Sequence, residues 1–106
     1  MKMSWNSLIK RIPSKVQVDK DIHYEVLWSD EISGDHHLMG QTRFDKGYKQ
    51  IVIRKDLSDQ DIIVTYLHEL LHAISFEYGI KLTENQILAL EKSFYYILKS
   101  NNVFKR

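Results

Sequence analysis

The hydrophobic periodicity of this 106-residue chain changes near Asp56, from the period of strands to the period of helices. Before Asp56, short runs rich in aromatic and β-branched residues stand between polar turns, as at residues 22–28 and 48–55. After Asp56, apolar residues recur every three or four positions, which is typical of helices packed on one face. A chain with strands first and helices second predicts an α+β fold.

The first half predicts a small, mostly antiparallel sheet over approximately residues 14–55. A short strand at Val16–Val18 is expected to pair with residues 22–28 across a polar turn. Residues 38–44 form a weaker strand candidate, interrupted by Gly40, and residues 48–55 form the clearest one.

The second half predicts an antiparallel hairpin of two helices over approximately residues 58–100. Ser58 is the expected N-cap of the first helix, and Gly79 is its expected stop. Thr83 followed by Gln86 forms a capping box at the start of the second helix. Because the loop between them is short, the two helices are expected to lie side by side.

Composition supports one folded domain, residues 1–106, and excludes several classes of function. Hydrophobic residues make up 43% of the chain, with only four glycines and one proline, which argues against disorder. The absence of cysteine excludes a disulfide framework, a thiolate zinc site and a cysteine nucleophile. A net charge of +1 and the lack of a long apolar run argue against nucleic acid and membrane partners. We therefore expect a soluble, cytoplasmic protein.

The first predicted helix contains the pattern His68-Glu69-Leu70-Leu71-His72. Histidines at positions i and i+4 lie on one helix face, so both imidazoles can reach one metal ion. Glu69 is turned about 100° from His68, close enough to act as general base toward a water on that metal. Tetrahedral zinc bound by two histidines retains two positions, one for a third protein ligand and one for water. Iron and manganese also suit two histidines with a carboxylate.

The third ligand is expected from the second helix. Glu91 lies in the middle of the apolar stripe of that helix, where an unpaired carboxylate would be costly to desolvate. If the helices run antiparallel from the loop, Glu91 faces the centre of the motif, and Glu84 faces the helix end near Glu77. Glu91 is therefore favoured as the ligand, with Glu84 and the loop at His36-His37 as alternatives.

Five other residues have weaker claims to a functional role. The pair His36-His37 is more typical of a solvated loop, and His23 is expected to be structural in its strand. Tyr95 could donate a hydrogen bond to an oxyanion, although a core role is favoured for it, and Tyr48 has a similar but weaker case.

The motif and its surroundings resemble the zincin metallopeptidases, most closely the small zincin-like proteins of phages and prophages. The run from Leu67 to Ile74, followed by Tyr78-Gly79 and Leu82-Thr83-Glu84, is similar to the recurring pattern of that group. The resemblance covers the helical half with its motif, and the sheet only by pattern.

In the gluzincin branch of the zincins, the third ligand is a glutamate of the next helix, and Glu91 stands at a matching distance after the motif. This likeness implies that His68, His72 and Glu91 bind zinc and that Glu69 is the catalytic base. Several members of the phage group carry a glutamate nearer the start of the second helix, which keeps Glu84 open.

The resemblance implies a zinc-dependent metallopeptidase that hydrolyses peptide bonds of a protein or peptide substrate through a metal-activated water. In zincins, a sheet edge above the metal helix pairs with the extended substrate, and residues 48–55 are the candidate for this edge. The alternative is a non-hydrolytic zinc-binding module for a protein partner, since the second lobe of a typical peptidase is missing. A structural or DNA-binding domain with a chance motif is the weakest reading, because the net charge is near neutral.

Overall fold

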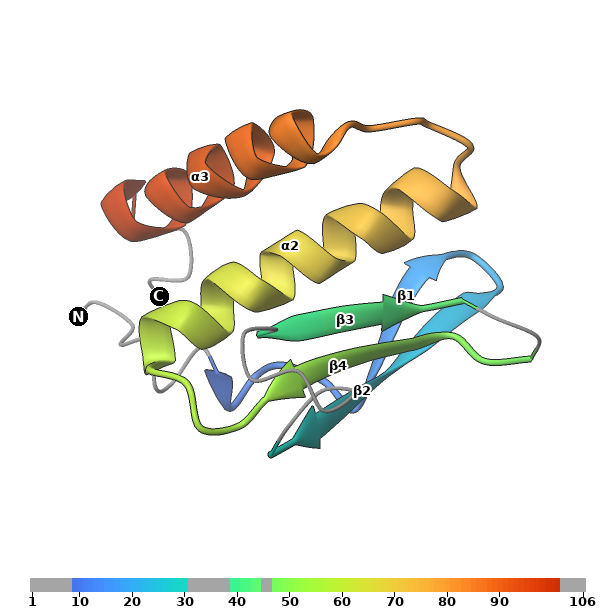
Figure 1. Ribbon diagram of the computed structural model, residues 1–106, viewed down its shortest axis with the longest axis horizontal. Coiled ribbons are helices and arrows are strands. Elements are labelled where there is room, and N and C mark those ends of the chain that lie inside the picture. Colours follow the sequence, from blue (N-terminus) through green and yellow to red (C-terminus); the bar gives the residue numbers. More distant parts are fainter. Residues whose placement is uncertain (1–8, 31–38, 45–46, 102–106) are drawn as a thin grey trace.

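The computed structural model describes residues 9–30, 39–44 and 47–101. Four strands come first and two helices follow (Figure 1). They are β1 (Lys15–Asp19), β2 (Ile22–Ser29), β3 (Gly40–Arg43), β4 (Gln50–Arg54), α2 (Asp59–Glu77) and α3 (Glu84–Asn101). The predicted α+β class, with the sheet before the helices, is confirmed.

The sheet is mixed, with the strand order β1-β2-β4-β3. The outer pairs β1–β2 and β3–β4 are antiparallel, whereas the central pair β2–β4 is parallel. The prediction of an antiparallel sheet is therefore wrong at its centre. The chain leaves β2, adds β3 on the far side of β4 and only then returns as β4, so β4 runs in the direction of β2.

This order also changes which strand lies at the edge. Ile51, Val52 and Ile53 of β4 are all buried, at 0 to 3% exposure. This is expected for an interior strand, and β4 has β2 as one neighbour and β3 as the other. The expectation that residues 48–55 form a free edge is wrong, because β3 occupies that side of β4. The edge strand on this side of the sheet is β3, and it contacts α2.

Both helices begin, and α2 ends, where local sequence signals predict. The Ser58 side chain accepts a hydrogen bond from the Asp61 backbone N–H at 3.2 Å, and Gly79 follows α2 with a φ of 65°. At the start of α3, the Thr83 and Gln86 side chains each accept a hydrogen bond from the other residue's backbone N–H, at 3.1 and 2.9 Å. The predicted capping box is confirmed.

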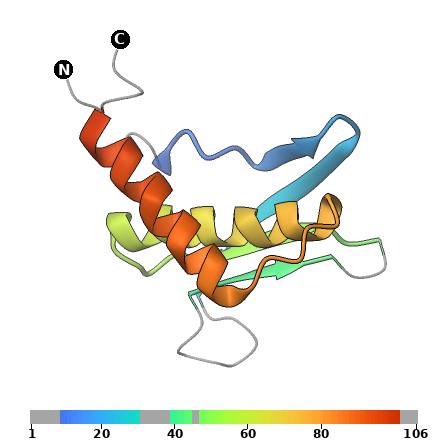
Figure 2. The ribbon, with the colours of Figure 1, turned by 90° about the horizontal axis from the view of Figure 1, so that it is seen from above.

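The molecule has three layers: the sheet, then α2, then α3 (Figure 1). The core lies between the sheet and α2, where Tyr24, Ile51 and Ile53 pack with Ile62 and Ala73. Helix α3 contacts α2 and none of the strands. Seen from above, α3 crosses over α2 at an angle rather than lying alongside it (Figure 2).

The segment between the helices sets where α3 meets α2. The Ser75 hydroxyl accepts a hydrogen bond from the Leu82 backbone N–H at 3.2 Å and donates one to the Ile80 carbonyl. These contacts draw the connection back along α2, so that α3 begins opposite the middle of α2. Glu84 therefore lies beside the motif, and the expectation that it faces the helix end near Glu77 is wrong.

Glu77 ties the C-terminal end of α2 to the sheet. Its Oε2 accepts a hydrogen bond from the Tyr24 hydroxyl at 2.6 Å and pairs with the Lys49 ammonium group. Burial of this carboxylate raises its pKa, but the hydrogen bonds from Lys49 and Tyr24 outweigh that effect, so the pKa of Glu77 lies below its ordinary value of 4.5. The ionised form is thus favoured more in the folded protein than in the unfolded chain.

We expect Glu77→Gln to lower the free energy of unfolding at neutral pH, with a difference from wild type that shrinks as the pH falls. Because the folded-state pKa is lowered, the contribution is complete above the unfolded value and disappears as the pH falls through the folded value. Urea denaturation at neutral pH and at an acidic pH measures how far the difference between variant and wild type shrinks. Glu25→Gln, at an exposed position on β2, is the matched control. An equal loss at both pH values would contradict the assignment.

Candidate metal centre

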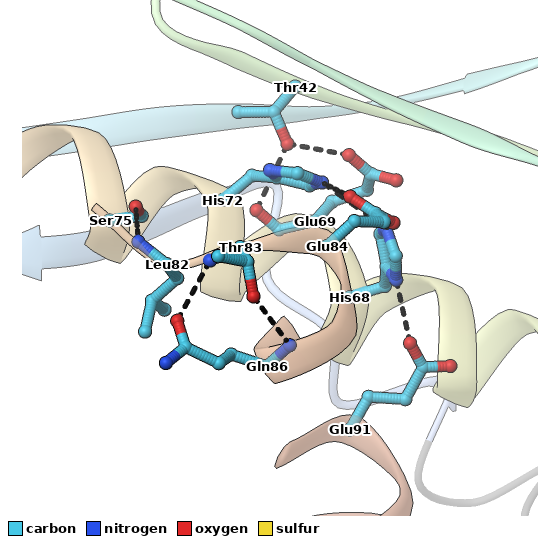
Figure 3. A network of polar contacts seen from close by, with 10 residues as sticks. All are labelled: Thr42, His68, Glu69, His72, Ser75, Leu82, Thr83, Glu84, Gln86 and Glu91. Carbon is cyan, nitrogen blue, oxygen red and sulfur yellow. Dashed lines mark hydrogen bonds and ion pairs between the residues drawn. The ribbon is translucent and has the colours of Figure 1, made fainter. Parts of the chain in front are cut away.

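Helix α2 brings His68 and His72 together on the face turned toward α3. Their Nε2 atoms are 3.2 Å apart, and their ring centroids are 4.9 Å apart (Figure 3). Both side chains are partly exposed, at 20% and 34%. Two imidazoles that aim the same nitrogen at one point form half of a metal site, as the spacing in the motif predicts.

Glu84, the first residue of α3, completes this cluster from the opposite helix. Its Oε1 lies 3.1 Å from Nε2 of His68, and its Oε2 lies 3.5 Å from Nε2 of His72. One ligand atom from each of the three residues lies within 4.8 Å of the others. The carboxylate therefore caps the pair of histidines at the open side of the site (Figure 3).

The two imidazole nitrogens and the Glu84 carboxylate are close enough together to bind one zinc ion. Bonds of about 2.0–2.1 Å at tetrahedral angles separate neighbouring ligand atoms by about 3.3 Å. The two Nε2 atoms are 3.2 Å apart; His68 Nε2 lies 3.1 Å from Oε1 of Glu84, and His72 Nε2 lies 3.5 Å from the other oxygen, Oε2. Two imidazole nitrogens and one carboxylate oxygen are also a common ligand set for a zinc that keeps a position for water. The residues present thus fit one such ion.

Glu91 lies on the other side of the His68 ring. It is 8% exposed, and its Oε1 is 2.6 Å from Nδ1 of His68. The sequence favoured Glu91 as third ligand over Glu84, and the structure brings Glu84 to the two Nε2 atoms. The further alternative, His36-His37, lies outside the described residues.

The intervening Glu69 points to the sheet side of α2. It is 6% exposed, and its Oε1 is 2.7 Å from the Thr42 hydroxyl, which also lies 3.0 Å from the Glu69 backbone oxygen. Burial raises the pKa of Glu69, and the opposing influences of Thr42, His68 and His72 do not cancel this effect. A carboxylate that binds a proton more readily than usual is suited to act as a general base.

Gly40 and Thr42 of β3 are site residues that sequence reasoning missed. A Cβ at position 40 would lie 2.5 Å from Cγ2 of Thr65 and 3.1 Å from Cγ and Oε2 of Glu69. Only glycine allows the strand backbone to pass this close to the carboxylate. The signal was present, because a glycine inside a strand pattern often marks a close approach of another group.

A cavity of about 340 Å³ lies beside His68, between β3, α2 and α3. Its lining includes the apolar side chains of Met39, Val64 and Leu88 and the carboxylates of Asp61, Glu69 and Glu91.

The other sequence candidates lie elsewhere. Neither Tyr48 nor Tyr95 lines this cavity; Tyr48 is 58% exposed, and the ring of Tyr95 has the Lys99 nitrogen 5.8 Å from its centroid. His23 lies exposed on β2, beside a larger and more open hollow of about 550 Å³. That hollow does not include the motif, so the smaller cavity is the one that bears on the chemistry.

Comparisons with protein-family models, curated proteins and solved structures found no match to this chain. Within the part of the chain that the structure describes, neither helix combines the length and the apolar character needed to cross a membrane. The geometry around His68 and His72 is therefore the observation from which function must be inferred.

We expect Gly40→Ala to destabilise the protein by about 1–3 kcal/mol, because the new methyl group overlaps the Thr65 methyl group. The double variant Gly40→Ala/Thr65→Ser removes that methyl group, keeps the hydroxyl and should recover part of the loss. Urea denaturation of the wild type, both single variants and the double variant gives the coupling energy between positions 40 and 65. A Gly40→Ala variant as stable as wild type would contradict the close approach of β3 to α2.

Proposed function

We propose that this protein is a zinc-dependent hydrolase of peptide bonds, with the metal held by His68, His72 and Glu84. The observation that carries the proposal is the convergence of two imidazole nitrogens, 3.2 Å apart, and the Glu84 carboxylate, next to the buried carboxylate of Glu69. The third ligand differs from the one that the sequence favoured. The Glu84 carboxylate lies near the Nε2 atoms of both histidines, whereas Glu91 contacts Nδ1 of His68.

The residues around the centre have distinct roles in this proposal. Zinc bound there would act as a Lewis acid on a carbonyl oxygen and on a water molecule. Glu69 accepts the proton that the attacking water releases, and it returns that proton to the leaving amine. Thr42 holds one oxygen of Glu69 and so limits the orientations of the carboxylate. Burial under β3 reduces competition from bulk water for the same carboxylate.

A peptide substrate is supported by the position of β3. This strand is the edge of the sheet and runs next to Glu69, so its outer side can pair with an extended chain. The cavity of about 340 Å³ beside His68 offers room for a side chain of that peptide, against Val64 and Leu88. Main-chain pairing plus one side-chain pocket is a common way to hold a peptide across a catalytic centre.

The second candidate is a zinc-binding module without hydrolytic activity, and the weak packing of α3 favours it. Ile87 and Glu91 are the only buried residues on α3. A metal shared by the histidines of α2 and Glu84 of α3 would fasten the two helices together. In that case the metal stabilises a surface for a protein partner, and Glu69 has no chemical role.

We expect Glu69→Gln to keep about one zinc per chain and to lose hydrolytic activity by roughly 10²- to 10⁴-fold, because the amide cannot accept the proton. Metal content by mass spectrometry, together with cleavage of an unfolded protein substrate, separates the two candidates. Glu84→Ala should lose the zinc as well as the activity.

Each outcome of this experiment bears on one or both candidate functions. Undiminished cleavage by Glu69→Gln would exclude the mechanism, and zinc without cleavage in the wild type would favour the structural module. A wild-type protein that binds no divalent metal would exclude both candidates.

We also expect Thr42→Val to lower kcat by roughly 10- to 100-fold with little change in KM, because the hydrogen bond to the Glu69 carboxylate is lost. Thr42→Ser keeps the hydroxyl group and should retain most of the activity. Steady-state kinetics on the same substrate compares the pair. If the serine and valine variants lose activity equally, the hydroxyl group is not what matters at this position.

A further inference from the structure

We infer that Glu91 is a positioning residue: it accepts the Nδ1–H of His68 and thereby holds the imidazole so that Nε2 faces the metal. This inference rests on the proposed metal centre and adds a residue that acts through His68 rather than on the metal. It concerns the side of the His68 ring that lies away from Glu84 (Figure 3).

The hydrogen bond determines which nitrogen of His68 can bind a metal. Oε1 of Glu91 lies 2.6 Å from Nδ1 of His68, and an ionised carboxylate can only accept, so when an ion takes the place of a proton at Nε2 the ring proton is on Nδ1. In a neutral imidazole the lone pair is then on Nε2. That nitrogen faces Glu84 at 3.1 Å and His72 at 3.2 Å, which is the position proposed for the ion.

The burial of Glu91 means that its carboxylate needs a polar partner. The side chain of Glu91 is 11% exposed, whereas that of Glu84 is 59% exposed. A buried carboxylate is costly to desolvate unless it is paired, and the partner that the structure provides is His68. Glu84 lies at the open side of the site, where a ligand can adjust to a cation, and Glu91 lies on the closed side.

The geometry separates the role of Glu91 from that of a ligand. Nδ1 and Nε2 project from the ring in diverging directions, so an oxygen bonded to Nδ1 is remote from an ion bonded to Nε2. A carboxylate that hydrogen-bonds the second nitrogen of a metal-binding histidine orients the ring and raises its basicity. Loss of such a partner commonly weakens metal binding by about 10- to 100-fold.

The test measures zinc affinity by competition with a chelator, in wild type and in three variants. Glu91→Leu should still bind one zinc per chain, with an affinity about 10- to 100-fold lower. Glu91→Gln keeps the shape and an acceptor oxygen, so its affinity should lie between those of Glu91→Leu and the wild type. Glu84→Ala should lose stoichiometric binding. Thermal denaturation of the metal-free variants establishes that each one folds.

A second measurement identifies the protonated nitrogen of His68 directly. Long-range ¹H–¹⁵N correlation spectra of the zinc-loaded wild type report which nitrogen of His68 carries the proton. The expected signature is a protonated Nδ1 and a zinc-bound Nε2, and zinc on Nδ1 would overturn the inference. In Glu91→Leu, the His68 signals should broaden or shift more than those of His72.

Three other results of the zinc measurements would contradict the role inferred for Glu91. Wild-type affinity in a folded Glu91→Leu variant would show that Glu91 does not position His68. Complete loss of zinc in both Glu91 variants, as in Glu84→Ala, would make Glu91 a ligand and overturn the inference while leaving the metal centre intact. A wild-type protein that binds no zinc would instead remove the proposed function itself, and the inference with it.

Discussion

The packing of α2 against the sheet is the interaction on which the rest of this structure depends. Tyr24, Ile51 and Ile53 press against one side of α2, and this contact fixes how the helix is rotated about its axis. Since successive residues are turned by about 100°, that rotation directs Glu69 to the sheet and leaves His68 and His72 facing α3. The motif is thereby divided between two interfaces. One side buries the carboxylate against β3, and the other leaves the imidazole nitrogens partly exposed.

The interface of α2 with α3 contains polar contacts at positions where most helix pairs pack apolar side chains. Two carboxylates of α3, Glu84 and Glu91, meet the histidines of α2, whereas Leu90, Phe94 and Ile97 remain 36 to 45% exposed. Little apolar area therefore holds α3 in place, and the contacts with His68 contribute a larger share of its attachment. An ion that joined the two helices would stabilise this arrangement by mass action. Metal binding and the docking of α3 are then one coupled event.

The parts of the fold that depend on local sequence could be predicted, and the parts that depend on distant contacts could not. Capping signals at Ser58 and Thr83 give the helix starts, because the hydrogen bonds involved span only three residues. The parallel pairing of β2 with β4 joins segments far apart in the sequence, and periodicity carries no information about direction. The register of the helices depends on the hydrogen bonds of Ser75 with the returning loop. Without those bonds, the sequence predicted that Glu84 would face the helix end near Glu77 rather than the motif.

The topology that periodicity could not reveal also supplies the surroundings of Glu69, the proposed base. A parallel β2–β4 pair requires the chain between these strands to reverse direction, and β3 is the strand on which it does so. This places β3 outside β4, at the edge of the sheet and against the middle of α2, where Gly40 and Thr42 meet Glu69. If β4 were the edge strand, Glu69 would have neither the hydroxyl partner nor the glycine that admits it. The parallel direction of the β2–β4 pair therefore determines which strand surrounds the proposed base.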